Sequence, residues 1–178
     1  MFRPTTSTSS LTRSFDRRTM LMASLALYAA ACVFPALKLH VGYTLGGDHG
    51  LVWHDQGYES IRGYELLWSG WFGPLVGNFA VFANPALWLA WLLSALRFHL
   101  GAAVSSGAAL VISTQTFRLY AQPYLFDEGG ARKGYLHTVE IGFICWVASM
   151  VLVLLWSLRA REAESPARPP AELGLRSR

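Results

Sequence analysis

The chain has 178 residues, of which 53% are hydrophobic and only 15% are charged, and its formal net charge at pH 7 is +4. Soluble domains carry roughly 25% charged residues, so this composition argues against an ordinary soluble protein. The small positive charge and the lack of a basic patch also argue against nucleic acid as a partner. The apolar residues are gathered in blocks, which is typical of a small membrane protein.

The amino-terminal region is predicted to be a tail followed by a spanning helix. Residues 1–18 are rich in Ser, Thr and Arg and hold too few apolar side chains to bury a core, so they predict a disordered cytoplasmic tail. Residues 19–39 would reach about 31 Å as a helix, which matches the hydrocarbon core of a bilayer. Arg17 and Arg18 before this block, and Cys32 within it, resemble parts of export signals. The apolar run continues past the cysteine, which favours an uncleaved span over a cleaved signal peptide.

Residues 40–63 are polar and rich in glycine, and they predict a loop outside the membrane. Imidazole and carboxylate groups are ligands for zinc and other divalent ions. Four of these groups cluster in the middle of the loop, namely Asp48, His49, His54 and Asp55. Their spacing matches no established site, and the neighbouring glycines favour a solvated loop over a metal site. No bound cofactor is therefore predicted.

The longest uncharged stretch lies within residues 64–96, where Glu65 is the one charged residue. The first part, residues 64–77, is rich in glycine and contains Trp68 and Trp71. Tryptophan is enriched at the boundary between membrane and water, so this part predicts a segment that lies at the interface. The second part, residues 78–96, predicts a second spanning helix.

Asn84 and Pro85 interrupt this second predicted span. Proline lacks a backbone donor and frees the carbonyl one turn earlier, which predicts a kink in mid-membrane. An unpaired amide in hydrocarbon is costly, so Asn84 is expected to bond to backbone on its own helix, or to Gln115 or Ser113 on the next one. A packing kink is favoured over a gate or a substrate contact.

Two further apolar blocks predict two further spans. Residues 100–117 form the third, in which Ala102 and Ser106 have the small-residue spacing that suits close helix packing. Residues 118–135 predict a second outer loop, and residues 136–158 predict the fourth span.

His137 and Glu140 are three residues apart, so on the fourth predicted helix they would share one face. Ionisable groups within a span are costly and are commonly functional. These two lie in the first turn, which favours an interfacial pair over a proton relay or a ligand contact. Residues 159–178 contain several prolines and predict a disordered cytoplasmic tail.

The basic residues predict the orientation. Ten of the fifteen Lys and Arg residues lie in the two tails and at Arg97, and the other five lie in the predicted outer segments. Cytoplasmic segments are enriched in Lys and Arg. Both termini are therefore predicted to be cytoplasmic.

Two runs, GWFGPLVGNFAVFANPALWLAWLL and GFICWVASMVLVLL, resemble stretches of small uncharacterised bacterial inner-membrane proteins. In those proteins an aromatic, glycine-rich segment leads into a span that contains Ala-Asn-Pro, and the last span contains Trp, a hydrophobic residue and Ala-Ser-Met. The resemblance covers about a quarter of the chain. It implies a multi-pass protein of the bacterial inner membrane and carries no activity.

These features together predict an all-α membrane protein with four spanning helices and one interfacial segment. Two function classes stay open. The favoured class is a non-enzymatic accessory or structural component that contacts the lipid bilayer and packs against other membrane proteins or against itself. The alternative is a small transporter or membrane enzyme that uses the outer Asp/His residues together with Asn84, Gln115, His137 and Glu140.

Overall fold

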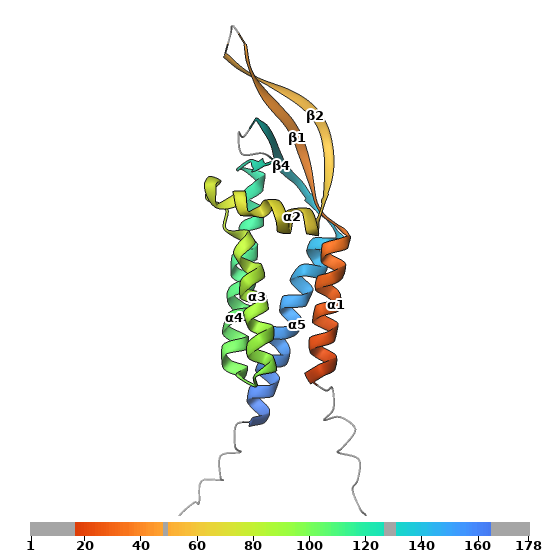
Figure 1. Cartoon of the computed structure of the whole chain (residues 1–178), viewed down its shortest axis with the longest axis vertical. Coiled ribbons are helices and arrows are strands. Elements are labelled where there is room, and N and C mark those ends of the chain that lie inside the picture. The colour runs from red at the N-terminus through yellow and green to blue at the C-terminus, as the bar shows by residue number, and fades with distance from the viewer. Residues whose placement is uncertain (1–16, 48–49, 127–130, 165–178) are drawn as a thin grey trace, which may run out of the picture.

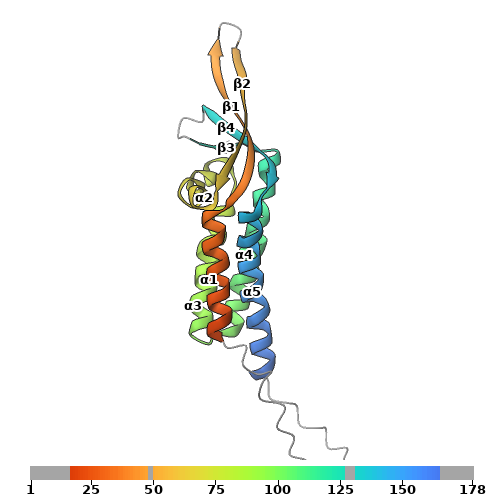
Figure 2. The ribbon, with the colours of Figure 1, turned by 90° about the vertical axis from the view of Figure 1, so that its right-hand side faces the viewer.

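The computed structural model describes residues 17–47, 50–126 and 131–164. Within these residues the chain forms a bundle of helices that carries an antiparallel sheet at one end (Figure 1). A view turned by 90° shows that the hairpin of the sheet extends the long axis of the bundle (Figure 2). The elements in chain order are α1 (Arg17–Val33), β1 (Pro35–Gly47), β2 (Gly50–Arg62), α2 (Gly63–Ser69), η1 (Gly70–Val76), η2 (Ala80–Phe82), α3 (Ala83–Ala95), α4 (His99–Ser113), η3 (Thr114–Tyr120), β3 (Tyr124–Leu125), β4 (Arg132–Val139) and α5 (Ile141–Glu164).

This is an α/β fold, so the prediction of an all-α protein with four spanning helices is wrong. The finding that overturns it is a four-stranded antiparallel sheet with the strand order β2-β1-β4-β3. Two helical segments of the described chain are long and apolar enough to cross a membrane, His99–Tyr120 with 22 residues and Ile141–Ala163 with 23. The apolar helices Arg18–Val33 and Ala80–Ala95 are shorter than the roughly 20 residues that a span requires.

The first predicted span, residues 19–39, ends as a strand rather than as a helix. Pro35 has no N–H with which to continue α1, and it begins β1 instead. Beyond it, Leu37 and Leu39 are buried, while Lys38 lies between them on the opposite face. A period of two is the signature of a strand, and the apolar composition of the block concealed it.

The structure also changes other predicted boundaries of helices and loops, because the segments concerned form strands. Residues 136–139 belong to β4, so the last helix begins at Ile141 rather than at residue 136. The predicted outer loops, residues 40–63 and 118–135, supply most of the sheet. The predicted tail of residues 159–178 begins inside α5, and its remainder lies outside the described residues, as do residues 1–16.

β1 and β2 form a long hairpin that projects beyond the bundle (Figure 1). The pairing shifts where Val41 lies opposite Gly57 and Gly42 lies opposite Asp55. This β-bulge depends on a glycine, because Gly57 has φ of 87°, a left-handed conformation that side chains rarely adopt.

One face of the sheet packs against the end of the bundle. The buried sheet residues alternate along the strands, and helical residues cover them from below. This cluster contains Ala36, Leu37, Leu39, Val41, Ile61, Leu119, Tyr124, Leu136 and Phe143. A second cluster lies deeper in the bundle and contains Ala83, Leu87, Ala90, Ala109, Met150 and Val153.

The bundle buries small polar residues beside its apolar clusters, and it exposes large apolar residues. Serine side chains are fully buried between its helices, where the Ser24 hydroxyl donates to the Ser149 carbonyl (2.9 Å) and the Ser106 hydroxyl donates to the Met150 carbonyl (2.6 Å). Large apolar side chains point outward instead, as at Val111, which is 71% exposed. Helices that pack in lipid typically place small residues where they contact one another and apolar residues on the outer surface of the bundle.

The aromatic segment of residues 64–77 lies at the end of the bundle, where α2 runs across the ends of the helices (Figure 1). Trp68 is 87% exposed there. α2 rests directly on the end of α1, since a Cβ atom at Gly63 would lie only 2.0 Å from the Ala31 carbonyl oxygen. The absence of a side chain at Gly63 therefore sets the position of α2.

Candidate functional site

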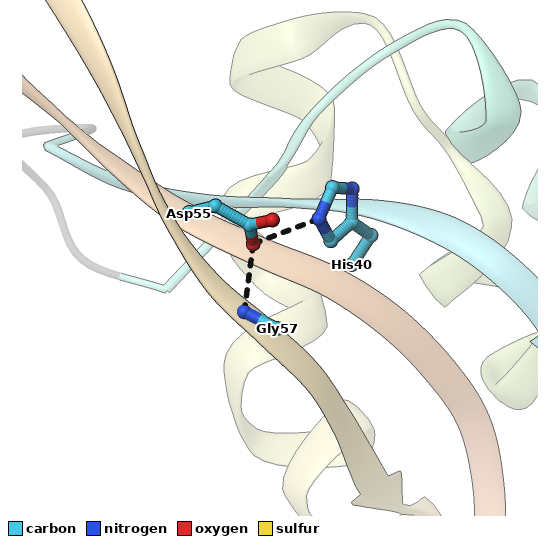
Figure 3. A network of polar contacts seen from close by, with 3 residues as sticks. All are labelled: His40, Asp55 and Gly57. Carbon is cyan, nitrogen blue, oxygen red and sulfur yellow. Dashed lines mark hydrogen bonds and ion pairs between the residues drawn. The ribbon is translucent and has the colours of Figure 1, made fainter.

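The outward face of the sheet carries a polar contact centred on Asp55 (Figure 3). Its Oδ1 atom accepts a hydrogen bond from the backbone N–H of Gly57 at 2.7 Å and lies 2.8 Å from Nε2 of His40. The first contact spans two residues of the bulge, which is the geometry by which Asp side chains stabilise turns. The second joins β2 to β1.

Aromatic side chains surround this contact. The ring of Tyr58 lies 5.2 Å from that of His40 and 4.6 Å from that of His137, between centroids. The ammonium of Lys38 lies 5.6 Å from the centroid of the same tyrosine ring. The outward face is thus a partly aromatic, partly ionisable surface with Tyr58 at its centre.

Of the four candidate ligands for a divalent ion, the two that lie in the described part of the chain, His54 and Asp55, do not come together. His54 and Asp55 are neighbours on β2, so their side chains point to opposite faces of the sheet. His54 stacks on Tyr43 at 5.0 Å, away from the pair of Asp55 and His40. Asp48 and His49 lie outside the described residues. No cluster of three or more His, Cys, Asp or Glu that could hold a metal occurs among the residues that the structure describes.

Asp55 is expected to titrate below its ordinary pKa of 3.8, because the Gly57 N–H, and then the His40 side chain, favour its carboxylate form. A pKa that is lower in the folded than in the unfolded chain stabilises the fold above the unfolded pKa. This contribution is lost as the pH falls through the folded pKa. Carbon-detected NMR titration measures the pKa of the Asp55 carboxyl group directly. In His40→Ala the pKa should rise while staying below 3.8, and an ordinary pKa in the unchanged chain would contradict the contact.

His137 and Glu140 do not share a helix face, so that prediction is wrong. His137 is a residue of β4, and Glu140 follows the strand, immediately before α5. The Ser60 hydroxyl donates to Oε1 of Glu140 at 3.1 Å, while Oε2 is buried with no hydrogen-bond partner in the described structure. The two side chains therefore belong to the junction between sheet and bundle.

Asn84 joins three helices. Its Oδ1 atom accepts hydrogen bonds from the Tyr28 hydroxyl on α1 (3.2 Å) and from the Trp146 indole on α5 (2.9 Å). Sequence analysis named Gln115 and Ser113 as partners outside its own helix, and those two are wrong. Gln115 instead accepts the Phe79 N–H through Oε1 at 3.1 Å.

Pro85 does not kink a helix in mid-membrane. α3 begins at Ala83, so Pro85 lies in the first turn. The N–H groups of the first turn have no partner within their own helix, and a proline there costs no intrahelical hydrogen bond. The Asn-Pro pair therefore marks the start of α3.

Replacing Asn84 with leucine is expected to lower the free energy of unfolding by about 1 to 3 kcal/mol, because two partly buried donors lose their acceptor. Thermal unfolding in mild detergent measures the loss. Leu92→Ala on the same helix is a suitable control, since this side chain is 56% exposed and accepts no hydrogen bond. Equal stability of Asn84→Leu and the unchanged chain would contradict the contacts of Tyr28 and Trp146.

A cavity that opens to the outside lies at the sheet end of the bundle. Its volume is about 840 Å³ when the open space at its entrance is included. Tyr28 and Cys32 of α1, Asn84 of α3, and Trp146 of α5 contribute to its walls. α2 and η1 contribute Gly63, Leu66, Leu67, Gly70, Gly73 and Val76. Asp, Glu, Lys, Arg and His are absent from the residues that line it in the described structure.

Sequence analysis missed Tyr28, His40, Tyr58 and Trp146, because each acquires its role from residues far away in the chain. One signal could have indicated His40, since it alternates with Leu39 and Val41 at the period of a strand. The structure therefore offers two places for chemistry, the Tyr58 face of the sheet and the cavity beside Asn84. Comparisons with protein-family models, with curated proteins and with solved structures give no match to this chain.

Proposed function

We propose that the protein is a multi-pass component of the bacterial inner membrane, with its helical bundle in the bilayer and its sheet in the periplasm. The segments His99–Tyr120 and Ile141–Ala163 are long and apolar enough to cross. α1 and α3 pack beside them, where α1 contacts α5 and α3 contacts α4. The sheet lies beyond the apolar layer.

The observation that supports this proposal is the exposure of large apolar side chains on the surface of the bundle. Leu92, Val104, Val111 and Leu155 are between 48% and 71% exposed. Monomeric soluble proteins rarely expose contiguous apolar surface of this kind. Lipid would cover these side chains, while the buried serines find partners among neighbouring backbone carbonyls.

The distribution of basic residues supports the orientation. Three parts of the chain lie at the end of the bundle away from the sheet (Figure 1). They are the start of α1, the end of α5 and the turn between α3 and α4. Arg97 lies in that turn, and Arg159 and Arg161 lie near the end of α5. The positive-inside rule then places both termini in the cytoplasm. The exposed Trp68 and Trp71 would lie at the opposite interface.

Within the membrane, the proposed role is that of a non-enzymatic accessory or structural component that packs against another membrane protein or a second copy. The support is that the polar residues which a small transporter or membrane enzyme would use do not come together in one site. His54 and Asp55 face opposite ways on β2, and Asn84 lies inside the bundle. The sheet, with Tyr58 on its outward face, would be the part available to soluble domains of partners.

Extraction of isolated membranes with sodium carbonate at pH 11 tests the insertion. The full chain is expected to stay in the membrane pellet, whereas a peripheral protein of the same cells is released as an internal control. A full chain recovered in the carbonate supernatant would contradict the proposal, because a bundle anchored only by surface contacts is released under these conditions.

A further inference from the structure

We propose that the cavity beside Asn84 binds an uncharged, largely apolar molecule that presents a carbonyl oxygen to the Asn84 amide. This proposal concerns the cavity itself and is tested on the purified chain, so it does not depend on the orientation or the membrane partners proposed above.

The cavity exists because long side chains, rather than close backbone packing, connect α1 to α3. The Trp91 indole donates to the Ser24 hydroxyl at 2.9 Å, and the Tyr28 and Trp91 rings meet edge to face at 5.2 Å. Toward the sheet from these bridges, Ala31 and Cys32 of α1 and Val81 before α3 line open space. The bridges thus hold the helices apart at the level of the cavity.

The orientation of the Asn84 amide follows from its neighbours. An indole N–H can only donate, so the atom 2.9 Å from Nε1 of Trp146 must be the amide oxygen. The Tyr28 hydroxyl donates to the same oxygen. The Nδ2 group is therefore a donor on a residue that lines the cavity, and within the described structure both hydrogen bonds of the Asn84 side chain go to its oxygen. A ligand carbonyl is the complementary group.

The lining determines the charge of the ligand. Burial of an ionised group without a partner costs far more than a hydrogen bond returns. Since the described lining offers no charged side chain, carboxylates, phosphates and ammonium groups are disfavoured. Two sources supply the remaining chemistry, the acyl ester of a membrane lipid and a lipid-soluble quinone, because each places a carbonyl on an apolar body.

Binding of radiolabelled methyl laurate to the full chain in mild detergent tests the proposal. Saturable binding of one ester per chain is expected. Tridecane, which lacks the acceptor, should compete about fivefold more weakly, as expected for the loss of one hydrogen bond. Laurate at pH 8 should compete more weakly still, because its carboxylate is charged.

A matched pair of variants localises the binding. A Cβ atom at Gly70 would meet Cγ2 of Val81 at 3.4 Å, an ordinary contact, and Gly70 has φ of −60°, which any residue adopts. Gly70→Leu should therefore fill the cavity without moving the backbone and weaken ester binding by about tenfold or more. Gly107→Leu is the control, because a Cβ atom there meets no atom of the described structure within 4 Å. It should bind like the unchanged chain.

Asn84→Leu should bind the ester and the alkane equally. If this variant fails to fold, two measurements still test the proposal. They are the comparison of ester with alkane in the unchanged chain and the binding of the ester to Gly70→Leu. Undiminished binding to Gly70→Leu, or an alkane that competes as strongly as the ester, would overturn the proposal. Dioctanoylglycerol and decylbenzoquinone should both displace the ester, and the one that does so at the lower concentration would identify the source as a lipid acyl ester or as a quinone. Displacement by neither would contradict the class.

Discussion

Gly63→Ala is expected to lower the free energy of unfolding by about 3 kcal/mol, at the upper end of the range for overpacked sites. The added Cβ atom would lie 2.0 Å from the Ala31 carbonyl oxygen and 3.0 Å from Cα of Cys32. These are backbone atoms, so no side-chain rotation relieves the clash. α2 must instead lift from the end of α1. Thermal unfolding of the purified chain in mild detergent measures the effect.

Gly107→Ala is the control for Gly63→Ala, because its Cβ atom would meet open space on the surface of α4. Alanine favours a helix over glycine by up to about 1 kcal/mol, so this variant should be as stable as the unchanged chain or slightly more stable. Equal stability of the two variants would show that α2 does not rest on α1.

Ser106→Leu is expected to lower the free energy of unfolding by about 2 to 3 kcal/mol and to separate α4 from α5. Ser106 is 0% exposed, and its hydroxyl lies 2.6 Å from the Met150 carbonyl oxygen. A leucine there has no space and removes the hydrogen bond between the helices. Thermal unfolding followed by the loss of helical circular dichroism measures the change.

Two variants separate the causes of the Ser106→Leu effect. Ser106→Ala removes only the hydrogen bond and should cost about 0.6 kcal/mol, the average for such bonds between membrane helices. Val104→Leu adds a methylene at a position on the same helix that is 64% exposed, and should leave stability unchanged. If Ser106→Leu resembled Val104→Leu, the buried contact between α4 and α5 would not exist.

The sequence predicts those helices that an apolar composition alone is sufficient to indicate. The segments His99–Tyr120 and Ile141–Ala163 largely coincide with apolar blocks, since a helix in apolar surroundings needs no particular pattern. The strands were not predicted, because Leu37, Leu39 and Val41 were counted as apolar residues and their alternation with polar ones was overlooked. A glycine-rich composition likewise favours a loop, although Gly57 serves a bulge inside a hairpin.

The surroundings of Asn84 show a second limit of sequence analysis. The physical rule that a buried amide needs partners applies to the residue itself, and it does not depend on the fold. Its partners, Tyr28 and Trp146, lie 56 and 62 positions away, and only the packing of α1 and α5 brings them together. Residues that face one another across three helices are set by tertiary structure, which one sequence does not reveal.

The exposed apolar face of the bundle is expected to contact lipid while the sheet contacts water. Single cysteines at Val111, Leu155 and Tyr58, each exposed in the structure, test it most directly in a chain whose native Cys32 and Cys145 are changed to alanine. A membrane-impermeant maleimide applied to spheroplasts should label the cysteine at position 58. It should leave those at 111 and 155 unlabelled until the chain is denatured. Labelling of positions 111 and 155 in intact membranes, at the rate of position 58, would contradict the account.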